Sequence, residues 1–338
     1  MLPLPEHYDA ATTSDWGNSP DHFAVLQQAI EWQVEHQISA SAKDVTKTHL
    51  VLIDLQRDFC FPAGTLYVGG RSGRGALDDT RRVVEFIYRH LDEITQISAT
   101  LDTHTAFQIF TPSFWVDRHG AHPPEHTTIT TDDILSERFS PNPRMAGWFG
   151  DGSLGWLKKH VLHYTRTLEL EGRYTLYLWP PHCILGSDGH VLAGAVQKAR
   201  LFHAYARDVE SPSIVKGDNP LTEHYSALRP EVMTDADGSS LGRRNEELIR
   251  TLLEADRVIL AGQAASHCVR STIDDLVDEA RRVDPELLRR FVVLTDCMSA
   301  VAVPEGDGSY RVDFTPEVDR SFERWAEAGI QLRKSVEM

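Results

Sequence analysis

The stretch RVILAGQAASHCVRST, residues 257–272, decides the fold. Its short apolar run, residues 258–261, is typical of a strand buried on both faces, and the run breaks at Gly262. A helix is expected to begin at Cys268, where the positive end of the helix dipole favours a thiolate over a thiol. This is where a cysteine hydrolase would carry its nucleophile. The alternative is an inert buried cysteine.

Strands and helices alternate on both sides of this stretch. Strands are expected at residues 49–54, 94–102, 211–217, 258–262 and 291–296, and helices at 76–94, 245–256, 268–282 and 318–329. A short final strand follows Gly329. The alternation predicts a three-layer α/β fold, in which a doubly wound, mainly parallel sheet carries helices on both faces. Ligand sites in such sheets lie at the carboxyl ends of the strands.

Two segments fall outside the alternation. Residues 1–47 are polar except for an amphipathic patch, HFAVLQQAIEWQV, which predicts a helix docked on the body. Residues 48–338 form a single domain with an insertion at about 105–178, which is rich in Pro, Gly, His and aromatic residues and contains a helix near 153–164. Its ends should lie at the rim of the site. Its aromatic residues either line a pocket wall or form a separate small core: Phe107, Phe110, Phe114, Trp115, Trp148, Phe149 and Trp156.

Composition restricts the partners. The net charge of −16 argues against nucleic acid and against an anionic membrane surface, because both need clustered Lys and Arg. No apolar run approaches the length of a membrane span, and the N-terminus does not resemble a secretory signal. The four cysteines are far apart and form no CxxC pair, so we expect reduced thiols and a cytoplasmic location.

Reactive residues follow the apolar runs. Asp54, Asp102 and Lys216 end predicted strands, and Cys268 follows another. Together they would meet at one edge of a parallel sheet, where a carboxylate, an ammonium group and a thiol suit acyl transfer. Asp54 could take the thiol proton and deliver it to a leaving amine, while Lys216 stabilises the thiolate. Each residue alone also fits a plain role: aspartates commonly end strands, and Lys216 could be a solvated surface lysine.

A metal site is predicted beside these residues. Asp102 and His104 project to the same side of an extended segment, and WPPHC supplies His182 from a proline turn. Two histidines and one carboxylate can bind a divalent metal and leave positions for water. Chance pairing is the alternative, because the chain has 16 histidines. Three further candidates lie in the insertion: His119, His122 and His126.

A glycine-rich stretch, GGRSGRG at residues 69–75, only loosely resembles a phosphate-binding loop. It lacks the Lys-Ser/Thr ending of a P-loop, and no continuous strand runs into it. We interpret it as a plain turn before the following helix.

The ordered motifs resemble the isochorismatase-like cysteine hydrolases, and within them the nicotinamidase-like branch. The motifs that carry the resemblance are LVLIDLQRDFCFPAGTLYVGG, DTH, WPPHC, VKGDNPLTEHYSAL and AGQAASHCVRST. They cover roughly residues 48–104 and 179–335 and include the cysteine that isochorismatases proper lack.

The resemblance implies a role for each matching residue. The catalytic residues would be Asp54, Lys216 and Cys268, with an oxyanion hole from the backbone N–H groups of Ala264 and Cys268 and a cis peptide near Gln263. Substrate-binding residues would be Phe59, Trp179, Tyr225 and Gln263. A divalent metal, Zn, Mn or Fe, would be held by Asp102, His104 and His182.

The sequence departs from the family pattern in three respects. Gln108 replaces a second histidine that often follows the Asp-x-His segment, so water or an inserted histidine could complete the metal shell. Ser266 replaces the aspartate usual two residues before the cysteine. The extension and the insertion make the chain longer than a typical nicotinamidase.

These observations predict a cysteine amidohydrolase that converts a small amide, nicotinamide or a related aromatic carboxamide, to carboxylate and ammonia. One alternative is hydrolysis of a ureido or other carbamoyl compound by the same triad. Another is a non-catalytic binding protein that retains the fold. The expected partner is a small-molecule amide, with no nucleic acid and no membrane, and a homo-oligomer is left open.

Overall fold

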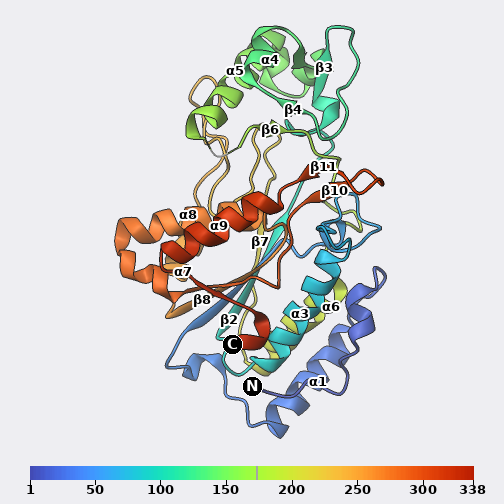
Figure 1. The fold of residues 1–338 in the computed structure, drawn as a ribbon. Helices are drawn as coiled ribbons and strands as arrows, with labels where there is room; N and C mark the ends of the chain where they lie inside the picture. The colour runs from blue at the N-terminus through green and yellow to red at the C-terminus, as the bar shows by residue number, and fades with distance from the viewer. Residues whose placement is uncertain (173) are drawn as a thin grey trace.

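The computed structural model describes residues 1–172 and 174–338 and centres on a six-stranded parallel sheet (Figure 1). The strand order is β12-β9-β8-β1-β2-β7, and every neighbouring pair is parallel. The strands are β1 (Thr48–Ile53), β2 (Gln96–Asp102), β7 (Ser213–Lys216), β8 (Arg257–Gly262), β9 (Phe291–Leu294) and β12 (Gln331–Arg333). The predicted three-layer α/β fold is confirmed.

One face of the sheet is covered by α1 (His22–Glu35), α3 (Gly75–Arg89) and α6 (Gly194–Ala206). Alternate strand residues point to these helices, as the twofold repeat of a strand requires. Leu50 of β1 stands beside Ile97 of β2 and Ile259 of β8, and all three lie in this core. The extension therefore packs on the sheet layer through α1, whose buried side chains include Val25, Ala29 and Trp32.

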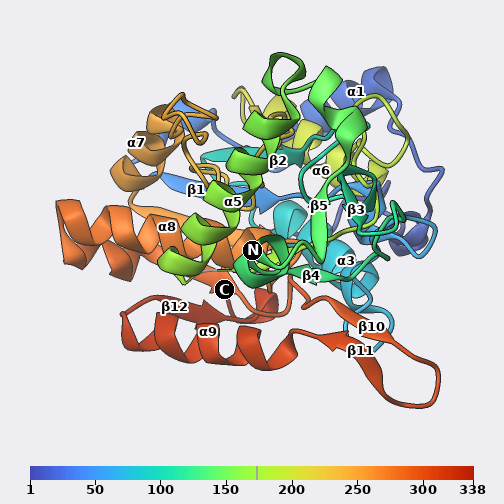
Figure 2. The ribbon, with the colours of Figure 1, turned by 90° about the horizontal axis from the view of Figure 1, so that it is seen from above.

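The opposite face is covered by α7 (Glu246–Glu254), α8 (Cys268–Val283) and α9 (Thr315–Glu327) (Figure 2). The intervening strand residues, Val51 and Ile53 in β1 and Val258 and Leu260 in β8, point to this side. Since both faces are covered, the central strands are apolar throughout, as their sequences predict.

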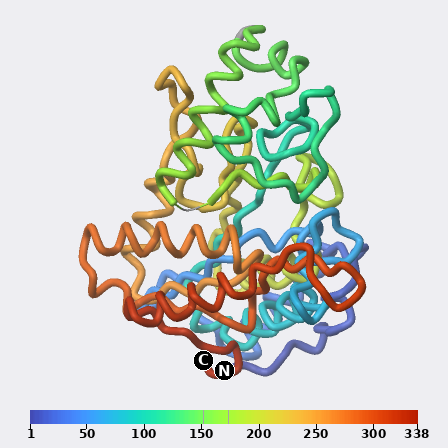
Figure 3. The backbone as a smooth tube through the Cα atoms, turned by 45° about the horizontal axis from the view of Figure 1, so that its top comes forward, coloured from blue at the N-terminus to red at the C-terminus, as the bar shows by residue number. Residues whose placement is uncertain are grey.

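Residues 105–178, the insertion, lie beyond the carboxyl ends of the sheet strands (Figures 1 and 3). It contains β3 (Trp115–Asp117), β4 (Thr128–Ile129), α4 (Thr131–Leu135), β5 (Phe139–Pro141), α5 (Leu154–Glu171) and β6 (Leu176–Tyr177). Antiparallel pairs β3–β5 and β4–β6 hold it together. Its core is continuous with Phe59, Val68, Trp179, Ala264 and Val301 of the main body.

Several elements were not predicted from the sequence. They are α6, the short helix α2 (Arg57–Cys60), the small strands of the insertion and the antiparallel pair β10 (Ala302–Pro304) and β11 (Tyr310–Asp313). Helix α6 has a mixed composition, and its burial against α1 and α3 stabilises it. No helix of the described residues is long and apolar enough to span a bilayer.

Candidate active site

The sheet brings the predicted strand-end residues to one edge. Asp102 stands opposite Lys216 in the β2–β7 ladder, and Ile53, which precedes Asp54, stands opposite Gly262 in the β1–β8 ladder. Asp54 leaves β1 with a φ of 47°, a left-handed conformation that is uncommon for a residue with a side chain and often marks a functional position.

Lys216 is the centre of the cluster. Its Nζ lies 2.9 Å from Oδ2 of Asp54, 3.1 Å from Oδ1 of Asp102 and 3.5 Å from Sγ of Cys268. It also donates to the backbone carbonyl of His224 at 2.9 Å. The side chain is only 1 % exposed, so the interpretation of Lys216 as a solvated surface lysine is wrong.

The charges in the cluster stabilise one another. Burial alone would lower the pKa of Lys216, but the carboxylates of Asp102 and Asp54 raise it well above its ordinary value. Burial likewise opposes ionisation of Asp102, yet His104 and Lys216 hold its pKa well below the ordinary value. For Asp54 burial prevails and raises the pKa, although Lys216 and a 2.5 Å hydrogen bond from the Thr100 hydroxyl work against it.

Cys268 is the first residue of α8, as predicted. Burial raises the pKa of its thiol well above the ordinary value, and Lys216 only partly offsets that rise. The expectation that the helix end would favour a resting thiolate is therefore corrected, because burial favours the neutral thiol at this depth. The sulfur lies within 4.8 Å of carboxylate oxygens of both Asp54 and Asp102, so a proton acceptor is close.

The turn before α8 presents two backbone donors. The Gln263–Ala264 peptide is cis, as the resemblance implies. In the described part of the chain, the N–H groups of Ala264 and Cys268 have no protein acceptor, whereas those of Gln263 and Ala265 donate to the carbonyls of Ile53 and Ser299. The two free donors suit a developing oxyanion.

A possible metal-ligand set adjoins the cluster: Asp102, His104 and His182 offer ligand atoms within 4.8 Å of one another. Nε2 of His104 lies 2.8 Å and Nε2 of His182 lies 3.5 Å from Oδ2 of Asp102. The two histidines come together because residues 183–185 run beside His104, with the His104 N–H bonded to the Cys183 carbonyl and the Leu185 N–H to the His104 carbonyl.

The donor set fits a divalent cation. Nδ1 of His104 bonds the Gly217 carbonyl at 3.2 Å, and Nδ1 of His182 bonds the Pro180 carbonyl at 2.7 Å. A carbonyl only accepts, so both Nδ1 atoms carry a proton, and the Nε2 atoms of both rings face the carboxylate. Burial lowers the pKa of His104 and favours the neutral ring. With Nε2 deprotonated, the two rings and the carboxylate offer three converging donor atoms that a divalent cation can bind.

The other metal-ligand candidates are placed elsewhere. His119, His122 and His126 do not join the ligand set found among the described residues. Gln108 is fully buried; its Nε2 lies 3.5 Å from the Gly217 carbonyl, and its Oε1 has no hydrogen-bond partner.

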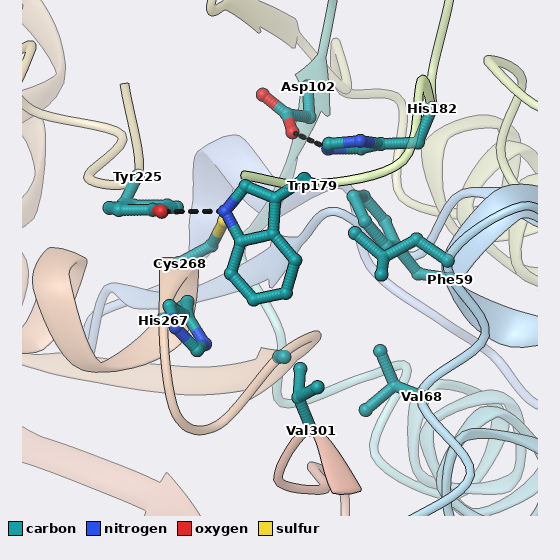
Figure 4. A pocket seen from close by; sticks show the side chains of 11 residues that line it. Phe59, Val68, Asp102, Trp179, His182, Tyr225, His267, Cys268 and Val301 are labelled. Atoms are coloured by element: carbon teal, nitrogen blue, oxygen red, sulfur yellow. Dashed lines mark hydrogen bonds and ion pairs between the residues drawn. The ribbon is translucent and has the colours of Figure 1, made fainter. Parts of the chain in front are cut away.

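A pocket of about 340 Å³, counting its open mouth, leads to Cys268 (Figure 4). Phe59, Trp179 and Tyr225 line it, as the resemblance implies. The indole Nε1 of Trp179 donates to the Tyr225 hydroxyl at 2.8 Å, and that hydroxyl donates to the buried carboxyl of Glu223. The wall is thus held by a chain of hydrogen bonds.

Gln263 does not line this pocket. It is fully buried, and its amide donates to Asp79 at 2.9 Å and accepts from the Ser299 N–H at 3.3 Å. Its contacts hold the turn that carries Ala264, so the structure places it behind the site rather than against a ligand.

Four further pocket residues were missed: Leu66, Val68, His267 and Val301. His267 is packed among Tyr174, Trp179, Tyr225 and Phe314, and burial lowers its pKa to about 3, so the ring is neutral. Its position directly before Cys268 in the sequence could have identified His267 as a pocket residue. Val301 lies on a loop with no pattern in the sequence that connects it to the site.

The aromatic residues of the insertion do not line the pocket; most of them pack in a core that continues into the main body. None of the seven named above lines the pocket. Phe114 and Trp115 are fully buried within the insertion, while Trp148 is exposed. Phe110 comes nearest the site, with its ring 4.8 Å from that of His104 and 5.9 Å from that of His182. The insertion therefore packs against residues of the site without lining the pocket.

Structural comparison defines the fold. The yeast nicotinamidase bound to the inhibitor nicotinaldehyde aligns over 85% of this chain and 99% of its own, with 17% identity and a TM-score of 0.51. The chain adopts the nicotinamidase fold. The predicted resemblance to the nicotinamidase-like branch is thereby confirmed at the level of fold.

Two further structures are similar over most of their length. An Acinetobacter baumanii nicotinamidase/pyrazinamidase aligns over 87% of this chain and 99% of its own, at 18% identity and a TM-score of 0.49. A Pyrococcus horikoshii pyrazinamidase in complex with zinc aligns over 85% and 99%, at 18% identity and a TM-score of 0.44. The sequence matches no family model and no curated protein.

Proposed function

We propose that the protein is a cysteine amidohydrolase that cleaves a small aromatic carboxamide, nicotinamide or a close relative, into a carboxylate and ammonia. One observation carries the proposal: a single buried ammonium group, Lys216, contacts Asp54, Asp102 and the sulfur of Cys268 at the end of an aromatic pocket. The nicotinamidase fold supports the same substrate class.

The first step is a proton transfer coupled to attack. Asp54 takes the proton of the Cys268 thiol, and the sulfur forms a bond to the carbonyl carbon of the amide. A raised carboxyl pKa makes Asp54 a stronger base than an exposed aspartate, which partly compensates for the raised pKa of the thiol. Lys216 remains charged and stabilises the anion as it forms.

The carbonyl oxygen becomes an oxyanion and accepts hydrogen bonds from the N–H groups of Ala264 and Cys268. When the intermediate collapses, the C–N bond breaks and the proton held on Asp54 passes to the leaving nitrogen. Ammonia departs and a thioester of Cys268 remains.

Water completes the reaction. Asp54, again a carboxylate, takes a proton from a water molecule whose oxygen attacks the thioester carbon. The C–S bond breaks, the carboxylic acid is released, and the thiol is restored. One water is consumed and one ammonia released per amide.

Asp102, His104 and His182 would hold a divalent metal, Zn, Mn or Fe, beside the pocket. When bound, such an ion supplies a Lewis-acidic centre that can orient a pyridine nitrogen or polarise a water. The chain's own contribution is to hold the two rings by the Gly217 and Pro180 carbonyls and to place Phe59 edge-on to His182, with ring centroids 5.4 Å apart.

An ammonia-release screen tests the proposal. The panel contains nicotinamide, pyrazinamide, benzamide, an aliphatic amide and two ureido compounds, with metal content measured on the same sample. We expect the pyridine and pyrazine amides to give the highest kcat/KM. Preference for the ureido compounds would identify the alternative hydrolase. A protein whose Cys268 reacts with iodoacetamide but which turns over no panel member would contradict the assignment.

A further inference from the structure

A second concave site lies away from the Cys268 pocket, between the N-terminal extension, β2, β7 and the start of α6. It encloses about 720 Å³, counting its open mouth. Its polar lining comes from Arg57, Arg200, His22, His190, Gln197 and Ser213. No aspartate or glutamate lines it, although the chain as a whole has a net charge of −16. A groove with two arginines and no acid is therefore unusual for this protein.

Arg200 is the more deeply buried of the two arginines. It projects from α6 and is only 6 % exposed. Nη1 donates to the Ser213 hydroxyl at 2.8 Å, but Nε is buried with no hydrogen-bond partner, and no carboxylate pairs with this guanidinium in the described part of the chain. Burial lowers the pKa of this guanidinium. A buried charge without a counter-ion is costly, so an external anion would offset a real free-energy penalty.

Another buried arginine shows what the missing partner would look like. Arg207, one residue beyond the end of the same helix, is 1 % exposed and forms two 2.5 Å contacts with the carboxylate of Asp44. The protein thus pairs one buried guanidinium internally and leaves Arg200 unpaired in a groove that is open to solvent.

Arg57 supplies the second charge. Its Nη2 donates to the Asn18 carbonyl at 2.9 Å, and its guanidinium lies 5.8 Å from the centre of the Trp16 ring. Nε is buried without a hydrogen-bond partner, and no ion pair forms at Arg57 within residues 1–172 and 174–338. These contacts fix the guanidinium without neutralising it.

The third contribution is a helix N-terminus. Helix α6 runs for 13 residues from Gly194, which lines the groove, and its N-cap residue, Ala193, provides no side-chain cap. Among the described residues, the N–H groups of Gly194, Ala195 and Val196 have no hydrogen-bond acceptor. Of these residues only Gly194 lines the groove, and through it the positive end of the helix dipole adds to the positive charge of the lining.

We propose that this groove binds a small oxyanion of the phosphate class, such as inorganic phosphate or a phosphate monoester. Two planar guanidinium groups can each present paired N–H donors to phosphate oxygens, and their combined charge matches a dianion. A monocarboxylate offers fewer acceptor oxygens and half the charge, so it should bind more weakly. The site is independent of the amidase chemistry proposed for Cys268.

The test is calorimetric titration of the full-length protein with inorganic phosphate at constant ionic strength, with acetate as the second arm. We expect one saturable site per chain, and affinity for acetate at least about tenfold lower. Arg57→Gln and Arg200→Gln should each weaken phosphate binding at least tenfold. Arg281→Gln, an exposed position on α8, is the matched control and should bind as the wild type does.

Arg200→Gln could disturb folding, so thermal unfolding is measured alongside. Phosphate should raise the Tm of the wild type and of Arg281→Gln, and raise it less in Arg57→Gln, whose side chain is partly exposed. The absence of saturable phosphate binding, equal affinity for acetate, or unchanged binding in Arg57→Gln would each overturn the proposal, the last because phosphate would then occupy another site.

Discussion

The carboxyl edge of the central sheet and the inserted body beyond it differ in what positions their residues. At the sheet edge, ladder register decides which side chains meet: Asp102 stands opposite Lys216 because β2 and β7 are paired. In the insertion, short two- and three-residue strands and an aromatic core do the positioning. Chemistry therefore gathers at the regular edge, while the irregular body supports it. Substitutions at the sheet edge should therefore lower the reaction rate, whereas substitutions in the insertion should lower the stability of the fold.

The largest effect is expected at the sulfur. Cys268→Ala should lower ammonia release on the order of 10⁴-fold or more, because no other group can form the thioester. Single-turnover and steady-state assays on nicotinamide measure it. Cys297→Ala, at a buried cysteine that does not line the pocket, is the control and should keep most of the activity. Comparable loss in the control, or normal turnover by Cys268→Ala, would contradict the assignment.

Asp54→Asn is expected to cost roughly 10³-fold in kcat, because the base for the thiol and the acid for the leaving amine are lost together. The amide can still accept the Thr100 hydroxyl and should leave the fold intact, which circular dichroism checks. Asp117→Asn, at the end of β3 in the insertion, should leave kcat within about twofold. A small effect at Asp54 would mean that another group moves the proton.

Loss of a metal ligand tests whether the residues at the sheet edge act without a bound metal. His104→Ala should lower the affinity for Zn²⁺ by at least about 10- to 100-fold, because one of three converging donors is lost. Equilibrium dialysis with elemental analysis provides the measurement, and His119→Ala, in the insertion, is the control. If chelation of the wild type removes metal without changing turnover, the ion has no part in the reaction.

Much of the sheet edge could be predicted from the sequence. Fully apolar runs such as β1 and β8 identify strands buried on both faces, and the polar residue that ends each run must lie at the carboxyl edge. The pairing of His104 with residues 183–185 could not be predicted, because it depends on where the chain returns after the insertion.

The protonation of Cys268 could not be predicted either. A helix start is visible in the sequence, but the depth of burial that raises the thiol pKa depends on Trp179, Tyr225 and Val301, which come from three separate loops. Likewise, β10, β11 and α6 are stabilised mainly by tertiary packing or pairing rather than by local patterns.

The substitution Phe114→Leu tests whether a change in the insertion affects stability rather than rate. Phe114 is fully buried among Trp115 and Phe149 and does not reach the pocket. Replacing the ring should lower the free energy of unfolding by about 1 kcal/mol, as apolar substitutions of similar volume do, and leave kcat/KM within about threefold. Urea unfolding and the nicotinamide assay measure the two quantities. A large kinetic defect without loss of stability would make the insertion part of the chemistry.

The last prediction concerns the carboxyl group behind the pocket wall. Burial raises the pKa of Glu223 from 4.5 to about 8, despite hydrogen bonds from the hydroxyls of Tyr225 and Tyr164. Between these two values the folded protein binds more protons at this site than the unfolded chain, so the contribution of Glu223 to stability falls as the pH rises from about 5 to 8. Glu223→Gln keeps an acceptor for Tyr225 but cannot ionise. Its free energy of unfolding should therefore increase relative to the wild type as the pH rises over this range, as urea unfolding at several pH values would show.

Glu323→Gln, at an exposed position on α9, should show no such trend. A pH-independent difference for Glu223→Gln would mean that the carboxyl is already ionised at pH 5, and that its two tyrosine partners outweigh its burial.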